Sequence, residues 1–266
     1  MRRRASAALE PSTSGSPCAS ARLRVYAATR PCTRTLTQID SRLRSDTDFY
    51  KVPKLVYHID EGAVAALTHF YDKRIVDGSE ILDICSSWVS HYPRDFPGRM
   101  KAIVGTGINE LELKCNDQLT QYAQADLNVK PKLPFPDKSF DFVTCVVSFD
   151  YLNQPLAVMR EVARVLRPGG QLILSQSNRC RKAAPPSLPA ACALSHLHAL
   201  PHPRTGFFTK AVGVWTRDMS DAAHLRVLGT YIHFAGSFEE PRAFDISAKG
   251  VGTNDPMYVV TASRRA

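Results

Sequence analysis

The chain has 266 residues, 44% hydrophobic and 22% charged, a composition that supports an ordinary buried core and excludes a disordered chain. Its formal charge of +9 is concentrated in residues 1–45, which carry nine Arg against Glu10 and Asp40, so the rest of the chain carries only +2. A nearly neutral body attracts a phosphate backbone weakly, and no apolar run reaches the roughly 20 residues of a membrane-spanning helix. We therefore expect neither a nucleic-acid partner nor a transmembrane segment.

Residues 1–45 are predicted to be a leader outside the fold, and residues 46–266 the folded domain. The first thirty residues are rich in Arg, Ser and Ala and nearly free of acids, which is typical of an organellar transit peptide. The stretch Val25–Ala28 (VYAA) is similar to a chloroplast-type processing site, so we expect the mature protein in the stroma. A disordered basic tail on a cytoplasmic protein, or a mitochondrial leader, is the alternative. Seven cysteines without a CxxC pair indicate reduced thiols rather than a disulfide framework.

The first half of the domain alternates helices and strands. Apolar residues at helical spacing predict a helix from about Glu61 to Ile75, and Asp60 is placed to cap it. The following elements are predicted in order: a strand in GSEILDI (78–84), a strand over Ala102–Gly105, a short helix in ELELKCNDQL (110–119) and a strand in QYAQADLN (121–128) that ends at Asp126.

The second half continues the alternation. The β-branched run DFVTCVVSF (141–149) suits a buried central strand, and QPLAVMREVARVLRPGG (154–170) is a helix that Pro168 and the two glycines stop. Next come a strand in QLILSQS (171–177), helical segments at 207–218 and 221–236, and two last strands in RAFDIS (242–247) and MYVVTA (257–262). Such alternation predicts a mostly parallel sheet with helices on both faces.

Residues 181–206 interrupt this pattern. They are rich in Pro, Ala and His, and we interpret them as a low-complexity surface insertion or a retained intron. The segment contains His196, His198 and His202, but a structural metal site needs four ligands in fixed geometry, so no metal is expected. The oligomeric state cannot be read from the sequence.

Five ordered segments resemble the class I S-adenosylmethionine (SAM)-dependent methyltransferases, of the type 11 kind: ILDICSS, VGTGINELEL, ADLN, LPFPDKSFDFVTCVVSFDYL and EVARVLRPGGQLILSQSNR. More narrowly, the chain is similar to a plant and algal branch whose first loop reads CSSWVSH where relatives have GxGxG. The resemblance implies a Rossmann-like three-layer α/β sandwich, with a seven-stranded, mostly parallel sheet whose last strand is antiparallel. It also implies SAM as cofactor and an unidentified small-molecule or lipid-like acceptor.

The resemblance implies a cofactor site at the carboxyl ends of the strands. SAM has no phosphate, so side-chain hydroxyls can replace the glycines of the first loop. Gly107 stands where many relatives place an acid that holds the ribose, with Asn109 as a partial substitute. The expected cofactor residues are Asp83, Cys85, Ser86, Ser87, Gly105, Gly107, Asn109, Asp126, Leu127 and Ser148. A capping role for Asp83 and an Asx turn at Asp126 are the structural alternatives.

No catalytic residue is assigned outright. Because the sulfonium already activates the methyl group, a base is needed only if the acceptor starts protonated. Asp150 and Tyr151, after the fourth strand, and His58, before the first helix, are the catalytic candidates, and Asn178 is the candidate for the substrate.

Two other functions stay open. The missing glycines and acid favour a catalytically inactive methyltransferase-fold protein that binds or assembles in the plastid. An NAD(P)-binding oxidoreductase is suggested only by GTGINE (105–110), which follows the second strand and lacks a third glycine. A serine hydrolase is disfavoured, because no GxSxG elbow occurs.

Overall fold

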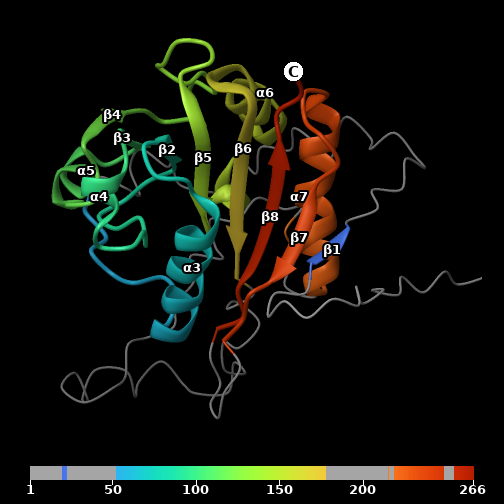
Figure 1. Cartoon of the computed structure of the whole chain (residues 1–266), viewed down its shortest axis with the longest axis horizontal. Coiled ribbons are helices and arrows are strands. Elements are labelled where there is room, and N and C mark those ends of the chain that lie inside the picture. The colour runs from blue at the N-terminus through green and yellow to red at the C-terminus, as the bar shows by residue number, and fades with distance from the viewer. Residues whose placement is uncertain (1–19, 23–51, 178–214, 216–218, 249–254) are drawn as a thin grey trace, which may run out of the picture.

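The computed structural model describes residues 20–22, 52–177, 215, 219–248 and 255–266, and these form one twisted sheet flanked by helices (Figure 1). The strand order is β1-β7-β8-β6-β5-β2-β3-β4. The strands are β1 (Ser20–Arg22), β2 (Glu80–Ile84), β3 (Ala102–Gly107), β4 (Gln121–Gln124), β5 (Phe140–Val146), β6 (Leu166–Gln176), β7 (Arg242–Asp245) and β8 (Tyr258–Ser263).

Strands β2 to β8 confirm the predicted seven-stranded sheet. β4, β3, β2, β5 and β6 are parallel neighbours, whereas β8 pairs antiparallel with both β6 and β7. The last strand is therefore the antiparallel one, as expected. The short strand β1 adds an eighth member at the edge, antiparallel to β7, and its three residues belong to the predicted leader.

Helices cover both faces of the sheet. The helices are α3 (Glu61–Arg74), α4 (Phe96–Arg99), α5 (Glu110–Cys115), a 3-10 turn η1 (Phe149–Tyr151), α6 (Pro155–Val165) and α7 (Asp221–Ala235). Leu67 and Tyr71 of α3 pack with Ile81 on one face, whereas α6 and α7 pack with Leu82 and its neighbours on the other. Figure 1 shows α3 in front of the sheet and α6 and α7 behind it, which is the three-layer sandwich that the sequence predicts.

Local sequence signals explain where several elements begin. The Asp60 side chain accepts a hydrogen bond from the Ala63 amide at 2.9 Å, so Asp60 caps α3 as expected. In α6, Met159 and Val162 are fully buried and form the apolar face of the helix. That face contributes about 1.5–3 kcal/mol for each large buried side chain relative to exposure.

Some predicted boundaries are wrong. β3 continues to Gly107 rather than ending at Gly105, and α5 ends at Cys115, four residues early. β6 begins at Leu166, inside the predicted helix, because this residue already pairs with Phe140 of β5 across a register irregularity. The four-residue helix α4 was not predicted.

Several predicted features lie outside the described residues: the leader apart from 20–22, the insertion 181–206 with its three histidines, Asn178, and the helix at 207–218 apart from buried Trp215. Within the described part of the chain, no helix is both long and apolar enough to cross a bilayer.

Candidate functional site

A pocket opens at the carboxyl ends of β2, β3, β4 and β5, where the strand order reverses between β2 and β5. Ligands of open α/β sheets bind at such a switch point. The structure brings eleven of the predicted residues to its lining: His58, Asp83, Cys85, Ser86, Ser87, Gly107, Asn109, Asp126, Leu127, Ser148 and Tyr151.

Two predicted residues do not line the pocket. Gly105 lies inside β3, where a Cβ would stand 2.4 Å from Leu119, so this glycine serves packing behind the site. Asp150 belongs to the same 3-10 turn as Tyr151, yet Tyr151 faces the pocket and Asp150 is absent from its lining. One further predicted residue, Asn178, lies outside the described residues.

The loop after β2 keeps a glycine-like backbone without glycine. Cys85 has φ of 54°, a left-handed conformation that favours glycine. The Ser86 amide then donates to the Thr106 carbonyl at 2.8 Å, which holds the loop against β3. This close approach excludes a side chain at Gly107, because a Cβ there would lie 2.2 Å from the Ser86 carbonyl oxygen. The acid that relatives place at this position has no room here.

Asp83 is buried at the floor, with 2% of its surface exposed. One carboxylate oxygen accepts hydrogen bonds from Ser86 and Ser90, both at 2.7 Å, and the other accepts from Thr144 at 3.0 Å. Burial raises the pKa of the Asp83 carboxyl to about 6, although the hydrogen bonds from Ser90, Ser86 and Thr144 oppose the rise. Asp83 thus organises the loop through hydroxyl groups rather than capping a helix.

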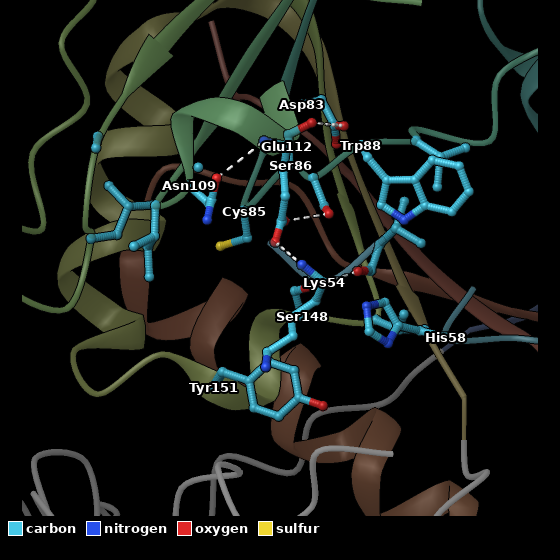
Figure 2. A pocket seen from close by; sticks show the side chains of 18 of the residues that line it. Lys54, His58, Asp83, Cys85, Ser86, Trp88, Asn109, Glu112, Ser148 and Tyr151 are labelled. Carbon is cyan, nitrogen blue, oxygen red and sulfur yellow. Dashed lines mark hydrogen bonds between the residues drawn. The ribbon is translucent and has the colours of Figure 1, made fainter. Parts of the chain in front are cut away.

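Glu112 is an acidic lining residue that the sequence analysis missed. It lies on α5, and its carboxylate accepts hydrogen bonds from the Lys54 amide at 2.7 Å and the Ser87 hydroxyl at 2.6 Å (Figure 2). Its spacing from Asn109 (N-x-x-E) is typical of a helix cap. Asn109 does cap α5, accepting from the amides of Leu111 and Glu112, but the Glu112 side chain turns to the pocket instead. The orientation of the Glu112 side chain is visible only in the folded structure, through its contact with Lys54.

His91 is a second unpredicted lining residue. Its φ is 60°, it is 7% exposed, and its Nδ1 has no hydrogen-bond partner among the described residues. Burial lowers the pKa of the His91 imidazole to about 4, so the ring is neutral at physiological pH. The unused nitrogen is itself buried, so the ring contributes an uncharged surface to the pocket.

The segment 52–58 forms one wall of the pocket. The Trp88 indole donates to the Val56 carbonyl at 3.3 Å, and its ring meets Tyr57 edge-on at 4.8 Å between centroids. Figure 2 shows Trp88 at the side of the pocket with His58 below it, so the indole supports this wall and does not plug the mouth.

The opposite wall follows β4. The Asp126 carboxylate accepts from the amides of Asn128 at 2.9 Å and Val129 at 3.3 Å, which is the Asx turn considered from the sequence. The side-chain amide of Asn128 donates a hydrogen bond to the Tyr151 backbone carbonyl at 2.9 Å, which connects this wall to η1. Among the residues that the structure describes, no three His, Cys, Asp or Glu side chains gather as a metal site requires.

Comparisons with known proteins point to a methyltransferase family. Residues 88–174 match the model of a methyltransferase domain family. Two curated relatives are named demethylmenaquinone methyltransferase. The relative from Bacillus licheniformis is 34% identical, and the match covers 38% of this chain and 46% of the relative's length. The relative from Listeria monocytogenes is also 34% identical, and that match covers 44% of this chain and 49% of the relative's length. The chain thus spans about half the length of the curated relatives it matches.

Solved structures show the same fold. One matching chain comes from a Haloferax volcanii complex that contains the Trm112 methyltransferase activator. Its TM-score is 0.51 at 14% identity, and the match covers 77% of this chain and 91% of that chain. The [4+2]-cyclase SpnF has a TM-score of 0.51 at 14% identity, over 80% and 89%. The fold is thus that of the class I SAM-dependent methyltransferases. More particularly, residues 88–174 match the methyltransferase domain family, and this family implies SAM as the cofactor.

Proposed function

We propose that the protein transfers a methyl group from SAM to a small, lipid-like acceptor of quinone type. The observation that carries the proposal is the gathering of hydroxyl and carboxylate side chains at the sheet's switch point within a methyltransferase-family segment. The names of the two demethylmenaquinone methyltransferases support the quinone-like class.

The pocket lining fits a nucleoside sulfonium. Gly107 has no room for an acidic side chain, and Glu112 presents a carboxylate with acceptor capacity beyond its two hydrogen bonds. We assign to Glu112 the ribose hydroxyls, in place of the acid absent at Gly107, and to Asp126 with Leu127 the adenine side. We assign the amino-acid portion of SAM to the hydroxyl-rich loop that Asp83 organises.

When bound, SAM supplies a methyl group activated by its positive sulfonium. The chain's own work is to align the acceptor and exclude water, and alignment alone is worth roughly 7–11 kcal/mol. His91 lines the pocket with a neutral ring, so it places no positive charge beside the sulfonium. Ser148 and Tyr151, on the far wall, and His58, on the near wall, flank the acceptor's position.

A transfer assay tests the proposal. The full chain is incubated with methyl-labelled SAM and naphthoquinols that carry or lack a prenyl tail, and extracted products are counted. We expect label in the prenylated product and at least tenfold less label with Glu112→Ala. SAM binding without label in any quinol would overturn the acceptor assignment and leave the cofactor assignment standing.

A catalytically inactive binding protein is the second candidate. The substituted loop favours it, because three hydrogen bonds already satisfy Asp83 and no glycine stands at Cys85. The [4+2]-cyclase SpnF, by its printed name, has this fold and another activity, so the fold alone does not decide. Failure to bind SAM at millimolar concentration would support this candidate.

We also propose import into the plastid stroma. The support is the acid-poor, Arg- and Ser-rich composition of residues 1–45. Isolated chloroplasts should import the labelled chain and shorten it near Ala28. Protection from protease without shortening, or no protection at all, would contradict the proposal.

A further inference from the structure

Two cysteines from neighbouring strands meet behind the surface of the pocket. Cys85 directly follows β2, is half-buried and has its side chain among those that line the pocket (Figure 2). Cys145 lies in β5 with none of its surface exposed. Because β2 and β5 are parallel with Asp83 opposite Thr144, Cys85 stands one residue beyond the position opposite Cys145. A half-buried thiol therefore lies in front of a fully buried one.

The backbone at Cys85 turns its side chain toward Cys145. Side chains alternate between the two faces of a strand, and Leu82 and Ile84 of β2 pack in the same core cluster as Cys145. Regular alternation would therefore send the Cys85 side chain to the opposite face. Its left-handed φ of 54° breaks the alternation, and Cys85 packs against the cluster that contains Cys145. The two thiols form a hydrogen bond.

The arrangement has the reach that a disulfide requires. Neighbouring strands lie about 4.8 Å apart and rise about 3.3 Å per residue, so the diagonal step from Cys85 to Cys145 spans about 6 Å between Cα atoms. A disulfide joins Cα atoms that are about 4.4–6.8 Å apart. A bond between the two sulfurs therefore needs only a small backbone movement.

The difference in burial sets the order in which the two thiols react. A reagent in the pocket reaches Cys85, whereas the protein covers Cys145 completely. The hydrogen bond with Cys85, and next its burial, raises the pKa of the Cys145 thiol. A protonated thiol is a poor nucleophile, so Cys145 does not react first. Cys85 is the thiol that meets an oxidant, and Cys145 is the partner that converts the product to a disulfide.

We propose that Cys85 and Cys145 are a reversible oxidation site, in which hydrogen peroxide links the cofactor loop to β5. The Cys85 sulfur attacks one peroxide oxygen, the O–O bond breaks, and the other oxygen leaves as water with the thiol proton, which gives a sulfenic acid. The Cys145 sulfur then attacks the Cys85 sulfur, the S–O bond breaks, and the hydroxyl leaves as water with the Cys145 proton. The two thiols lose two electrons, and these reduce the peroxide to two waters.

The disulfide changes the pocket. It takes the Cys85 sulfur out of the lining, and it moves the start of a loop that the Ser86 hydroxyl and amide hold to Asp83 and Thr106. We expect bound SAM to shield Cys85 from peroxide, and the disulfide to weaken SAM binding by about tenfold, since coupling between two sites is reciprocal. This effect on SAM rests on the proposed function, whereas formation of the disulfide does not.

Peptide mapping tests the disulfide. The full chain is treated with hydrogen peroxide, the remaining thiols are blocked with N-ethylmaleimide, and tryptic peptides are analysed by mass spectrometry. Because trypsin cuts after Lys and Arg, the two cysteines fall in the separate peptides 75–94 and 139–160, and neither peptide contains another cysteine. We expect these two peptides to be joined after oxidation and to separate again with dithiothreitol.

A matched control uses the exposed Cys115 at the end of α5, which does not line the pocket. Cys115→Ser should form the linked peptides at the native rate, whereas Cys145→Ala should lose them and let Cys85 proceed to sulfinic acid. The result with the native chain does not depend on whether Cys145→Ala folds. The proposal would be overturned by an unreacted Cys85, by a disulfide from Cys85 to a different cysteine, or by sulfinic acid at Cys85 in place of the linked peptides.

Titration with SAM separates this inference from the proposed function. One native sample is titrated after oxidation and again after dithiothreitol. Affinity about tenfold weaker in the oxidised chain, and restored by dithiothreitol, supports the coupling between disulfide and cofactor. Equal affinity in both states would overturn that coupling. A chain that forms the disulfide but never binds SAM would defeat the proposed function and leave the oxidation site standing.

Discussion

Cys85 shows how the site keeps a glycine conformation without glycine. Its φ of 54° costs a side-chain-bearing residue about 1 kcal/mol or more. His91 and Val147, with φ of 60° and 39°, also line the pocket, so three of the four positive-φ non-glycine residues in the described chain gather there. Strained backbone of this kind clusters at functional sites, where the surrounding structure holds it in place.

Cys85→Gly should raise the free energy of unfolding by about 1 kcal/mol, because glycine adopts this φ without steric cost. Urea denaturation measures the change. Cys85→Ala is the control, since it removes the thiol and keeps the Cβ. Equal stability of the Gly and Ala variants would show that the backbone carries no strain.

Gly107→Ala should lower the free energy of unfolding by about 1–3 kcal/mol and SAM affinity by about tenfold or more, because the new Cβ displaces the Ser86 carbonyl. Gly98→Ala is a matched control, since a Cβ there meets nothing within 4 Å. Calorimetric titration and denaturation measure both quantities. Native affinity in Gly107→Ala would refute the close approach.

Asp83 makes stability depend on pH. Its folded pKa is raised from 3.8 to about 6, so its contribution is full below the unfolded pKa and is lost as pH rises through the folded one. His91 acts oppositely over an overlapping range, because its depressed pKa favours unfolding as pH falls from 6.5 toward 4. The two effects largely cancel in the native chain.

The Asp83→Asn variant separates the pH dependence that Asp83 causes from that of His91. Relative to the native chain, its free energy of unfolding should rise by about 3 kcal/mol between pH 4 and pH 7, since about two pKa units of linkage are removed. Denaturation curves at several pH values measure this difference. A difference that stays constant with pH would mean that Asp83 titrates normally.

Among the elements, α5 and the segment 52–58 are joined by one carboxylate. Glu112→Ala should speed hydrogen exchange of the Lys54 amide by about tenfold or more, because this charge-assisted bond is lost. Glu110→Ala is the control, since Glu110 contacts Lys114 on the exposed side of the same helix. If both variants exchange at the native rate, Glu112 does not hold the wall.

Elements with clear periodicity could be predicted, and those defined by distant contacts could not. α6 and β5 carry long apolar patterns, so their types followed from the sequence. The start of β6 at Leu166 depends on pairing with Phe140, which local signals cannot show. Glu112 escaped prediction for the same reason, because its partner Lys54 is 58 residues away.

At the scale of the whole molecule, the sheet assembles the site from four separate stretches of chain. Parallel pairing brings the carboxyl ends of β2, β3, β4 and β5 to one edge, so ordered motifs predicted most of the lining without any knowledge of distances. What the sequence could not supply is the orientation within each stretch. Tyr151 faces the pocket and the adjacent Asp150 does not.

The most direct test of the account is isothermal titration of the full chain with SAM and with its demethylated product, S-adenosylhomocysteine. The account predicts saturable binding of one ligand per chain for both compounds, weakened about tenfold or more by Gly107→Ala and unaffected by Gly98→Ala. Absence of heat and of any thermal stabilisation at millimolar ligand, in a chain with native circular dichroism, would contradict it.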